Sequence, residues 1–221
     1  MSPGNRFVKI RSELSPEVGI VVAVKTRSSE EIREVIDAGA SDVGENYVQE
    51  AEKARSTLGD RNLSVRWHLI GPLQKNKINK ALSLFDVIQT VDSLAIATSL
   101  DLRALRSGVT IPVMMEINSG REQAKSGFMP DQNELLKAVS AVAGMQGLRL
   151  TGLMTMGPFC ANPEDLRPLF RRTRELFETA REALQQDFFN TLSMGMSDSY
   201  RIAVEEGSNQ VRLGTVIFGA R

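Results

Sequence analysis

Short apolar runs alternate with longer amphipathic segments along the chain. The first apolar run, residues 20–24, is too short for a helix and predicts a strand. The segment 28–38 repeats its apolar residues at helical spacing, and Ser28 and Glu31 have the separation of a capping box. Gly39 marks the expected end of that helix. This first pair of segments therefore predicts one βα unit.

Seven further units repeat this rhythm, which is typical of a parallel sheet. Eight units in about 200 residues favour a closed (β/α)8 TIM barrel over a doubly wound open sheet, which ordinarily has fewer strands. The remaining strands are expected at 42–44, 65–70, 86–91, 112–117, 148–154, 191–194 and 210–213, and the helices at 47–58, 76–84, 94–106, 133–143, 163–185 and 198–206, with a last apolar turn at 216–218.

We expect one domain over residues 1–221, with residues 1–18 as a short N-terminal extension. The apolar residues Phe7, Val8 and Ile10 of this extension are expected to form at most a brief lid over the barrel bottom. Lys plus Arg and Asp plus Glu both number 27, so no broad basic field attracts nucleic acid or anionic lipid. A nucleic-acid partner is therefore not expected.

The chain has one cysteine, Cys160, and one histidine, His68. They can form neither an internal disulfide nor a structural zinc site. No apolar run reaches the roughly 18 residues of a membrane helix, and the N-terminus lacks a signal sequence. We expect a cytoplasmic protein without a metal site or a membrane segment.

In a TIM barrel the functional residues lie at the C-terminal ends of the strands. Lys25 ends the apolar run 20–24, where partial desolvation disfavours the ammonium form, as a Schiff-base lysine requires. The alternative is a lysine whose head group extends into water from the strand end. Its position alone leaves both interpretations open.

A second cluster follows the last two strands, where segments 194–198 and 212–215 each combine a glycine with a hydroxyl. Free backbone N–H groups at such junctions bind anions, and phosphate commonly binds after strands 7 and 8 of this fold. Alternatively, Ser197 only caps a helix and Gly214 only turns the chain. A phosphate site facing a lysine suggests pyridoxal 5′-phosphate (PLP), although class I aldolases share these features.

Seven segments in order resemble the PLP homeostasis protein family, also called the YggS/PROSC family. The match runs from about residue 20 to the end of the chain, so that together the short motifs are specific. The segments are VAVKT (22–26), GENYVQE (44–50), WHLIGPLQKNK (67–77), KSG (125–127), GLMTM (152–156), SMGMSD (193–198) and VRLGTVIFG (211–219).

The resemblance implies an alanine-racemase-like barrel that carries PLP as a Schiff base on Lys25. It also implies phosphate contacts from Ser197 and the Gly214–Thr215 turn, with Arg212 directed at the pyridine nitrogen. A guanidinium cannot accept the proton of that nitrogen, so the ring becomes a poor electron sink and transaminase-like chemistry is disfavoured.

Three further residues complete the expected cofactor site. Asn46 is expected to hydrogen-bond the ring oxygen, His68 to support the site from inside the barrel, and Met194 to contribute shape. Lys125 is the candidate for a second amine that receives PLP during transfer. In the family a small hydroxyl residue usually precedes the lysine, whereas here Val24 adjoins Lys25, and a missing residue could shift the strand register.

Two classes of function remain. A PLP carrier needs only a reversible Schiff base and an accessible pocket, whereas an amino-acid racemase also needs a second domain that supplies the opposing base. With the chain ending at Arg221, we expect no such domain and hence a non-catalytic carrier. A Schiff-base aldolase is the less favoured third option, and a visible absorption band would distinguish it. The expected partners are PLP and PLP-dependent apoenzymes, with the protein itself a monomer.

Overall fold

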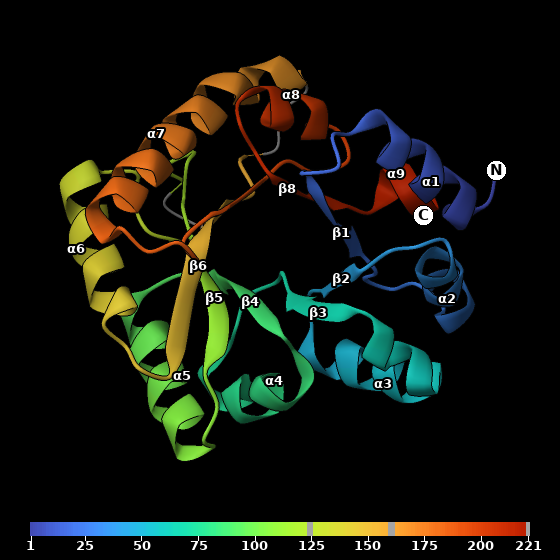
Figure 1. The fold of residues 1–221 in the computed structure, drawn as a ribbon, viewed down its shortest axis with the longest axis horizontal. Coiled ribbons are helices and arrows are strands. Elements are labelled where there is room, and N and C mark those ends of the chain that lie inside the picture. The colour runs from blue at the N-terminus through green and yellow to red at the C-terminus, as the bar shows by residue number, and fades with distance from the viewer. Residues whose placement is uncertain (123–125, 159–161, 220–221) are drawn as a thin grey trace.

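The computed structural model describes residues 1–122, 126–158 and 162–219, and within them eight parallel strands close into a barrel (Figure 1). The strands follow one another in sequence order, and β8 pairs with β1 to complete the circle. The TIM barrel is therefore confirmed. The strands are β1 (Gly19–Ala23), β2 (Asp42–Glu45), β3 (Arg66–Leu69), β4 (Val87–Val91), β5 (Ile111–Glu116), β6 (Leu148–Thr155), β7 (Thr191–Met194) and β8 (Gln210–Leu213).

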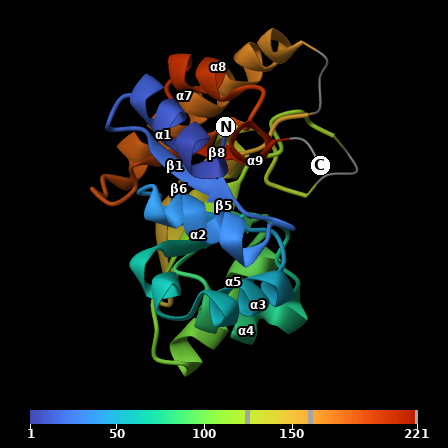
Figure 2. The same cartoon turned by 90° about the vertical axis from the view of Figure 1, so that its right-hand side faces the viewer.

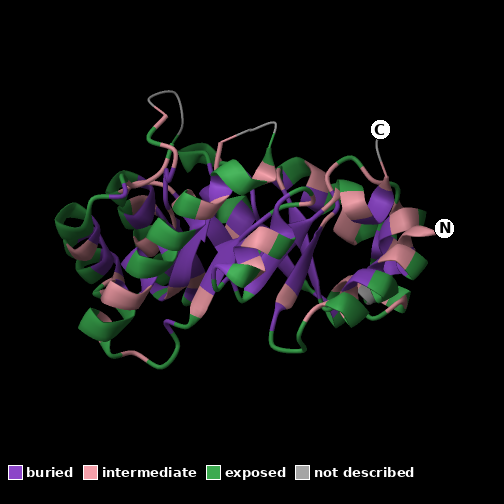
Figure 3. Ribbon diagram, turned by 90° about the horizontal axis from the view of Figure 1, so that it is seen from above, coloured by how far each residue is buried: buried purple, intermediate pink, exposed green. Residues whose placement is uncertain are grey.

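Helices surround the strands, and their buried faces point inward while their outer faces are exposed (Figure 3). Figure 2 looks onto the side where α1, α2 and α3 follow one another around the barrel. The α-helices are α1 (Pro3–Glu13), α2 (Ser29–Asp37), α3 (Val48–Leu58), α4 (Ile78–Leu84), α5 (Leu94–Arg106), α6 (Gln132–Ala143), α7 (Arg167–Leu184), α8 (Tyr200–Glu205) and α9 (Thr215–Phe218), and the 3-10 turns are η1 (Gly59–Ser64), η2 (Lys75–Lys77) and η3 (Pro163–Leu166).

Alternate strand residues face two different layers. On β1, Ile20 and Val22 belong to the large apolar core between strands and helices. Val21 faces the barrel interior, where its side chain would lie 2.8 Å from a Cβ at Gly44. That close approach explains why the second strand carries a glycine there.

Local sequence signals define several elements as expected. The predicted bounds of α5, β7 and β8 agree with the structure, and Ser28 and Glu31 form both hydrogen bonds of the capping box at α2. Gly39 follows α2 with φ +100°, a conformation that favours glycine. The helix predicted over 163–185 instead begins as η3. Pro168 lacks a backbone donor, so α7 starts with it in the first turn.

The N-terminal extension differs from the expectation of a brief lid at the barrel bottom. It forms α1, which packs beside α2 and α9 in the outer ring of helices. Ser2 caps the helix by accepting from the Asn5 N–H, and Pro3 occupies the first turn. Phe7 and Ile10 are buried at one helical face, so this segment is part of the core.

Helix α7 is strongly amphipathic, and its exposed face carries charged side chains. Among residues 1–122, 126–158 and 162–219, no helix is long and apolar enough to cross a membrane.

Candidate functional site

Lys25 directly follows the end of β1 and keeps the alternation of that strand. The Val24 N–H donates to the Gly44 carbonyl, so the pairing with β2 continues to the residue before Lys25. Val24 packs in the outer core, which leaves Lys25 on the interior side of the strand, as Val21 is. Its Nζ lies 5.4 Å from the centroid of the Tyr47 ring. The strand register is therefore kept as far as Val24, the residue before Lys25.

The segments after β7 and β8 meet through the side chain of Ser197. Its Oγ accepts from the backbone N–H groups of Gly214 and Val216, both at 3.2 Å. Gly195 allows the chain to turn here with φ +92°, and a Cβ at this position would lie 2.9 Å from the Tyr200 Cα. The structure thus brings Ser197 to the Gly214–Thr215 turn, as the resemblance implies.

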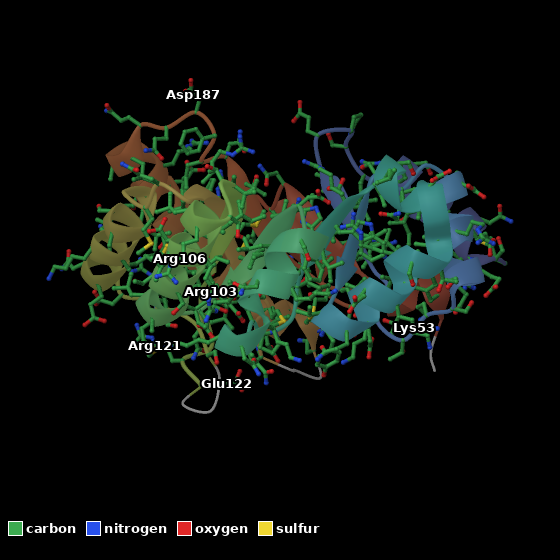
Figure 4. The ribbon with its side chains drawn as sticks, turned by 90° about the horizontal axis from the view of Figure 1, so that it is seen from below. Lys53, Arg103, Arg106, Arg121, Glu122 and Asp187 are labelled. Carbon is green, nitrogen blue, oxygen red and sulfur yellow. The ribbon has the colours of Figure 1, made fainter. Side chains whose placement is uncertain are left out.

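The pairing of β1 with both β2 and β8 joins these segments at one end of the barrel. Ala23 pairs with Gly44, and a Cβ at Gly214 would lie 3.5 Å from the Ala23 Cβ. Lys25 therefore lies between Asn46, which follows β2, and the Gly214–Thr215 turn. Figure 4 shows the two barrel ends: Arg121 and Glu122, after β5, lie opposite Asp187, which precedes β7.

Arg212 is buried within the barrel near this C-terminal mouth. Its Nη1 donates to the Ser193 carbonyl and hydroxyl at 3.0 and 2.7 Å, and its Nη2 donates to the Thr155 carbonyl at 2.7 Å. Burial lowers the pKa of Arg212 to about 10, and the negative charge of Glu116 opposes that decrease. The guanidinium therefore remains charged at neutral pH.

A cavity of about 250 Å³ opens at the ends of β5, β6 and β7. Glu116 contributes a carboxylate to this cavity, and Met156 and Met196 contribute apolar walls. Sequence analysis assigned no site role to Glu116. Its position at a strand end was the available signal. The lining residues are Glu116, Ile117, Asn118, Ser119, Gly120, Glu122, Ser126, Met156, Gly157 and Met196.

His68 lies deeper inside the barrel, away from the mouth. Its Nε2 is 2.7 Å from Asp42 Oδ1 and its Nδ1 is 2.9 Å from Gln89 Nε2. It lines a cavity of about 550 Å³ at the N-terminal end of the strands. His68 therefore lies inside the barrel but toward the end opposite the mouth, and its expected support of the cofactor site stays a prediction.

Asp42 and Glu45 are buried at opposite faces of β2. Although burial raises the pKa of Asp42, hydrogen bonds from His68, Ser41 and Arg66 outweigh it and lower the pKa to about 2. Burial raises the pKa of Glu45 to about 7, with a further contribution from the charge of Glu50. Glu45 lines a cavity of about 370 Å³ between α2 and α3, outside the barrel.

One expected contributor, Met194, lies elsewhere, and another falls outside the described residues. The side chain of Met194 is fully buried in the apolar core between strands and helices, whereas Ser193, one residue earlier, faces the interior. Lys125 lies outside the residues that the structure describes.

Sequence reasoning missed several polar residues of the barrel interior. They form hydrogen bonds with His68, with Arg212 or with one another and are Asp42, Gln89, Thr155, Ser193 and Gln210. A polar side chain within an otherwise apolar strand, such as Gln89 in VIQTV, was the signal that could have found them. Within the described part of the chain, no group of three or more His, Cys, Asp and Glu residues could hold a metal ion.

Comparison with known proteins places these features in a family. The model of the alanine racemase N-terminal domain matches residues 5–221. The pyridoxal phosphate homeostasis protein of Aquifex aeolicus is 38% identical over 202 residues, which cover 90% of this chain and 85% of the relative. That of Escherichia coli K12 is 38% identical over 217 residues, covering 94% and 88%.

Solved structures agree with the sequence relatives. PipY of Synechococcus elongatus PCC7942, solved without PLP, superposes with a TM-score of 0.92 at 32% identity and covers 99% of this chain and 100% of PipY. PipY with PLP bound gives a TM-score of 0.88. An alanine racemase of Clostridium difficile 630 shares the fold, with a TM-score of 0.84 at 15% identity over 57% of its length. The chain belongs to the pyridoxal phosphate homeostasis protein family, within the alanine racemase N-terminal domain family.

Proposed function

We propose that this protein binds PLP at the C-terminal mouth of its barrel and serves intracellular PLP homeostasis, with Lys25 as the residue that attaches the cofactor as a Schiff base. The observation that carries the proposal is the convergence of an amine, a turn that presents backbone N–H groups and a buried guanidinium at one barrel end. A relative of the same fold, PipY, has been solved with PLP bound.

The groups present fit the three functional parts of PLP. Its aldehyde requires a primary amine, which Lys25 supplies on the interior side of β1. Its phosphate requires several hydrogen-bond donors, and Gly214 and Val216 direct two backbone N–H groups to the Ser197 hydroxyl. A phosphate oxygen beside that hydroxyl would receive the same donors, with Thr215 adding a second hydroxyl. Asn46, after β2, is the proposed partner of the ring oxygen.

Arg212 is the proposed neighbour of the pyridine nitrogen. PLP is a stronger electron sink for amino-acid chemistry when that nitrogen carries a proton. The guanidinium cannot accept such a proton, and with a pKa of about 10 it stays positive and opposes a second positive charge nearby. Arg212 therefore favours storage of the cofactor over catalysis.

The decisive experiment locates the attachment site. Purified protein loaded with PLP is reduced with borohydride, and its peptides are mapped for the pyridoxyl label. We expect the label on Lys25 and the loss of the visible absorption band in Lys25→Ala. The matched control is Lys137→Ala, which removes an exposed lysine of α6 and should leave the band unchanged. A label found chiefly on another lysine would contradict the assignment.

The phosphate turn is tested by comparing PLP with pyridoxal, which lacks the phosphate. In Ser197→Ala, the affinity for PLP should fall by roughly one to two decades, since a hydrogen bond to a charged group contributes on the order of 1.5–3 kcal/mol. The affinity for pyridoxal should change little. Equal losses for both ligands would place the phosphate elsewhere.

The proposal also predicts no rapid amino-acid chemistry. PLP-loaded protein is incubated with L-alanine in deuterium oxide, and exchange of the Cα proton is followed by NMR. We expect exchange at the rate of free PLP, because Arg212 disfavours the electron sink and a second base is needed on the opposite face for racemisation. Exchange near the ~10 s⁻¹ typical of enzymes would instead favour a racemase.

In this proposal the protein acts as a cytoplasmic monomer that delivers PLP to PLP-dependent apoenzymes. The position of Lys25 at a strand end, beside the half-exposed ring of Tyr47, supports an attachment site within reach of solvent. Light scattering at micromolar concentration tests the oligomeric state. Transfer is tested by following the recovery of activity of an apoenzyme mixed with the loaded protein, compared with an equal concentration of free PLP.

A further inference from the structure

A continuous series of hydrogen bonds crosses the barrel interior from Arg212 to Asp42. Arg212 Nη1 lies 2.7 Å from Ser193 Oγ, which is 2.8 Å from Gln89 Oε1. Gln89 Nε2 lies 2.9 Å from His68 Nδ1, and His68 Nε2 lies 2.7 Å from Asp42 Oδ1. All five residues are buried. We call this series the Gln89 chain.

The two ends of the Gln89 chain fix the direction of every bond within it. Arg212 can only donate, so the hydroxyl hydrogen of Ser193 is directed to Gln89 Oε1. The Gln89 amide nitrogen then donates to His68 Nδ1 and to Gln210 Oε1, at 2.9 and 2.8 Å.

At the other end, Asp42 can only accept, because hydrogen bonding that outweighs its burial keeps its pKa at about 2. His68 therefore carries its proton on Nε2, which donates to Asp42, and accepts at Nδ1. In this arrangement each bond of the Gln89 chain has one donor and one acceptor.

We propose that Gln89 is a positioning residue for Arg212, an inference that rests on the proposed function because Arg212 is there the neighbour of the pyridine nitrogen. The Oε1 atom of Gln89 holds the Ser193 hydroxyl hydrogen away from the guanidinium, so that Ser193 Oγ presents a lone pair to Arg212. Without that acceptor, the hydroxyl hydrogen is free to rotate toward Arg212 and repel it.

The donor-to-acceptor direction of the Gln89 chain couples Arg212 to His68, although the two residues are not in direct contact. A change at Arg212 or Ser193 removes the reason for the Gln89 amide to point its nitrogen at His68. Asp42 keeps the His68 proton on Nε2, so the nitrogen-15 shift of Nδ1, which accepts from that amide, is the reporter of how Arg212 is held. Because the protein contains a single histidine, the two ring nitrogens of His68 can be observed without overlap.

The first test uses the protein without PLP and long-range proton–nitrogen NMR of the labelled histidine. We expect the wild type to show a bare Nδ1 and a protonated Nε2. In Ser193→Ala and Arg212→Met the Gln89 amide loses the partner that sets its orientation, so the nitrogen-15 shift of Nδ1 should move, while Nε2 stays protonated because Asp42 still accepts from it. In Gln89→Glu, carboxylate oxygens replace the amide nitrogen opposite Nδ1, and both nitrogens should carry protons.

Thr90→Val is the matched control for these variants. Thr90 neighbours Gln89 on β4, is equally buried, and donates to the Gly71 carbonyl rather than to the Gln89 chain. Its substitution removes a buried hydrogen bond without touching the chain, so the His68 spectrum should match the wild type. A protonated Nδ1 in the wild type, or an unchanged His68 spectrum in both Ser193→Ala and Arg212→Met, would overturn the proposal.

The second test measures PLP binding by absorbance titration. Gln89→Leu removes the acceptor for Ser193 while keeping a similar volume, and PLP affinity should fall by roughly two- to tenfold, the effect of one neutral hydrogen bond. Thr90→Val should bind as the wild type does, and affinity retained in Gln89→Leu would contradict the positioning role. If the wild type itself bound no PLP, the proposed function would fail. The histidine spectra alone would then decide whether the Gln89 chain positions Arg212.

Discussion

The pKa values of the two buried carboxylates of β2 are shifted in opposite directions, although both residues lie on the same strand. Asp42 faces the barrel interior, where His68, Ser41 and Arg66 direct donors to it, and its pKa falls to about 2. Glu45, three residues later, faces the layer between β2 and the helices α2 and α3, where it meets the carboxylate of Glu50, and its pKa rises to about 7. Burial is similar at both sites, so the partners decide the charge.

This difference predicts opposite effects of pH on stability. Asp42 has a depressed pKa, so its contribution to stability is present above about 3.8 and is lost as pH falls toward 2. Glu45 has a raised pKa, so its contribution is present below about 4.5 and is lost as pH rises through about 7. The interior favours a charged carboxylate, and the outer layer favours a neutral one.

The largest effect is expected from Asp42→Leu, which leaves the donors of His68 and Arg66 without their acceptor. Breaking such a buried charged interaction should lower the free energy of unfolding by about 3–5 kcal/mol. Urea unfolding at neutral pH measures it. Asp42→Asn keeps an acceptor oxygen for His68 and should therefore lose less stability. Equal losses in the two variants would show that the hydrogen bonds of Asp42 contribute less to stability than the volume of its side chain.

A somewhat smaller effect is expected from Glu45→Gln, which keeps the oxygen that accepts from the Asn46 N–H. The wild type should lose about 3 kcal/mol of stability as pH rises between the unfolded and folded pKa values of Glu45, and the variant should not. At mildly alkaline pH the variant is then the more stable protein, and near pH 4.5 the two are equal.

Unfolding curves across this pH range provide the measurement for Glu45→Gln. Glu182→Gln, on the exposed face of α7, is the control and should follow the wild type throughout. Parallel pH profiles for the wild type and Glu45→Gln would show that Glu45 is already ionised with little cost.

The smallest effect is expected from Ser41→Ala, which removes one of the donors to Asp42. The pKa of Asp42 should rise, and stability at neutral pH should fall by about 1 kcal/mol, the contribution of a single hydrogen bond. The difference from the wild type should vanish as pH approaches 2, where Asp42 is protonated in either protein. A loss that is independent of pH would mean that Ser41 acts on the backbone rather than on the charge.

The strands could be predicted because their signal is local. The run 20–24 is apolar on both faces, since one face packs on helices and the other on the barrel interior, and such runs bounded by turns indicate buried parallel strands. The helix α1 was missed because its apolar residues Phe7 and Ile10 are few, although Ser2 and Pro3 formed a recognisable start.

The site could be predicted only in part. The meeting of Ser197 with Gly214 agrees with the interpretation of the sequence, whereas the role of Lys25 stays a prediction. The Gln89 chain could not be anticipated, because its bonds join residues far apart, such as Ser193 and Gln89, separated by 104 positions. Which strands face each other across the interior follows from the register of the closed barrel, which no local pattern specifies.

The closure of the barrel has a consequence for protein synthesis. Because β1 pairs with β8 as well as β2, and Arg6 of α1 donates to the Ile217 carbonyl, the first elements find their last partners only when residues 210–218 have left the ribosome. Until then β1 is an edge strand with unpaired backbone groups, exposed to chaperones and to aggregation. The Gly214–Thr215 turn is translated just as late, so a nascent chain has no complete mouth with which to capture cofactor.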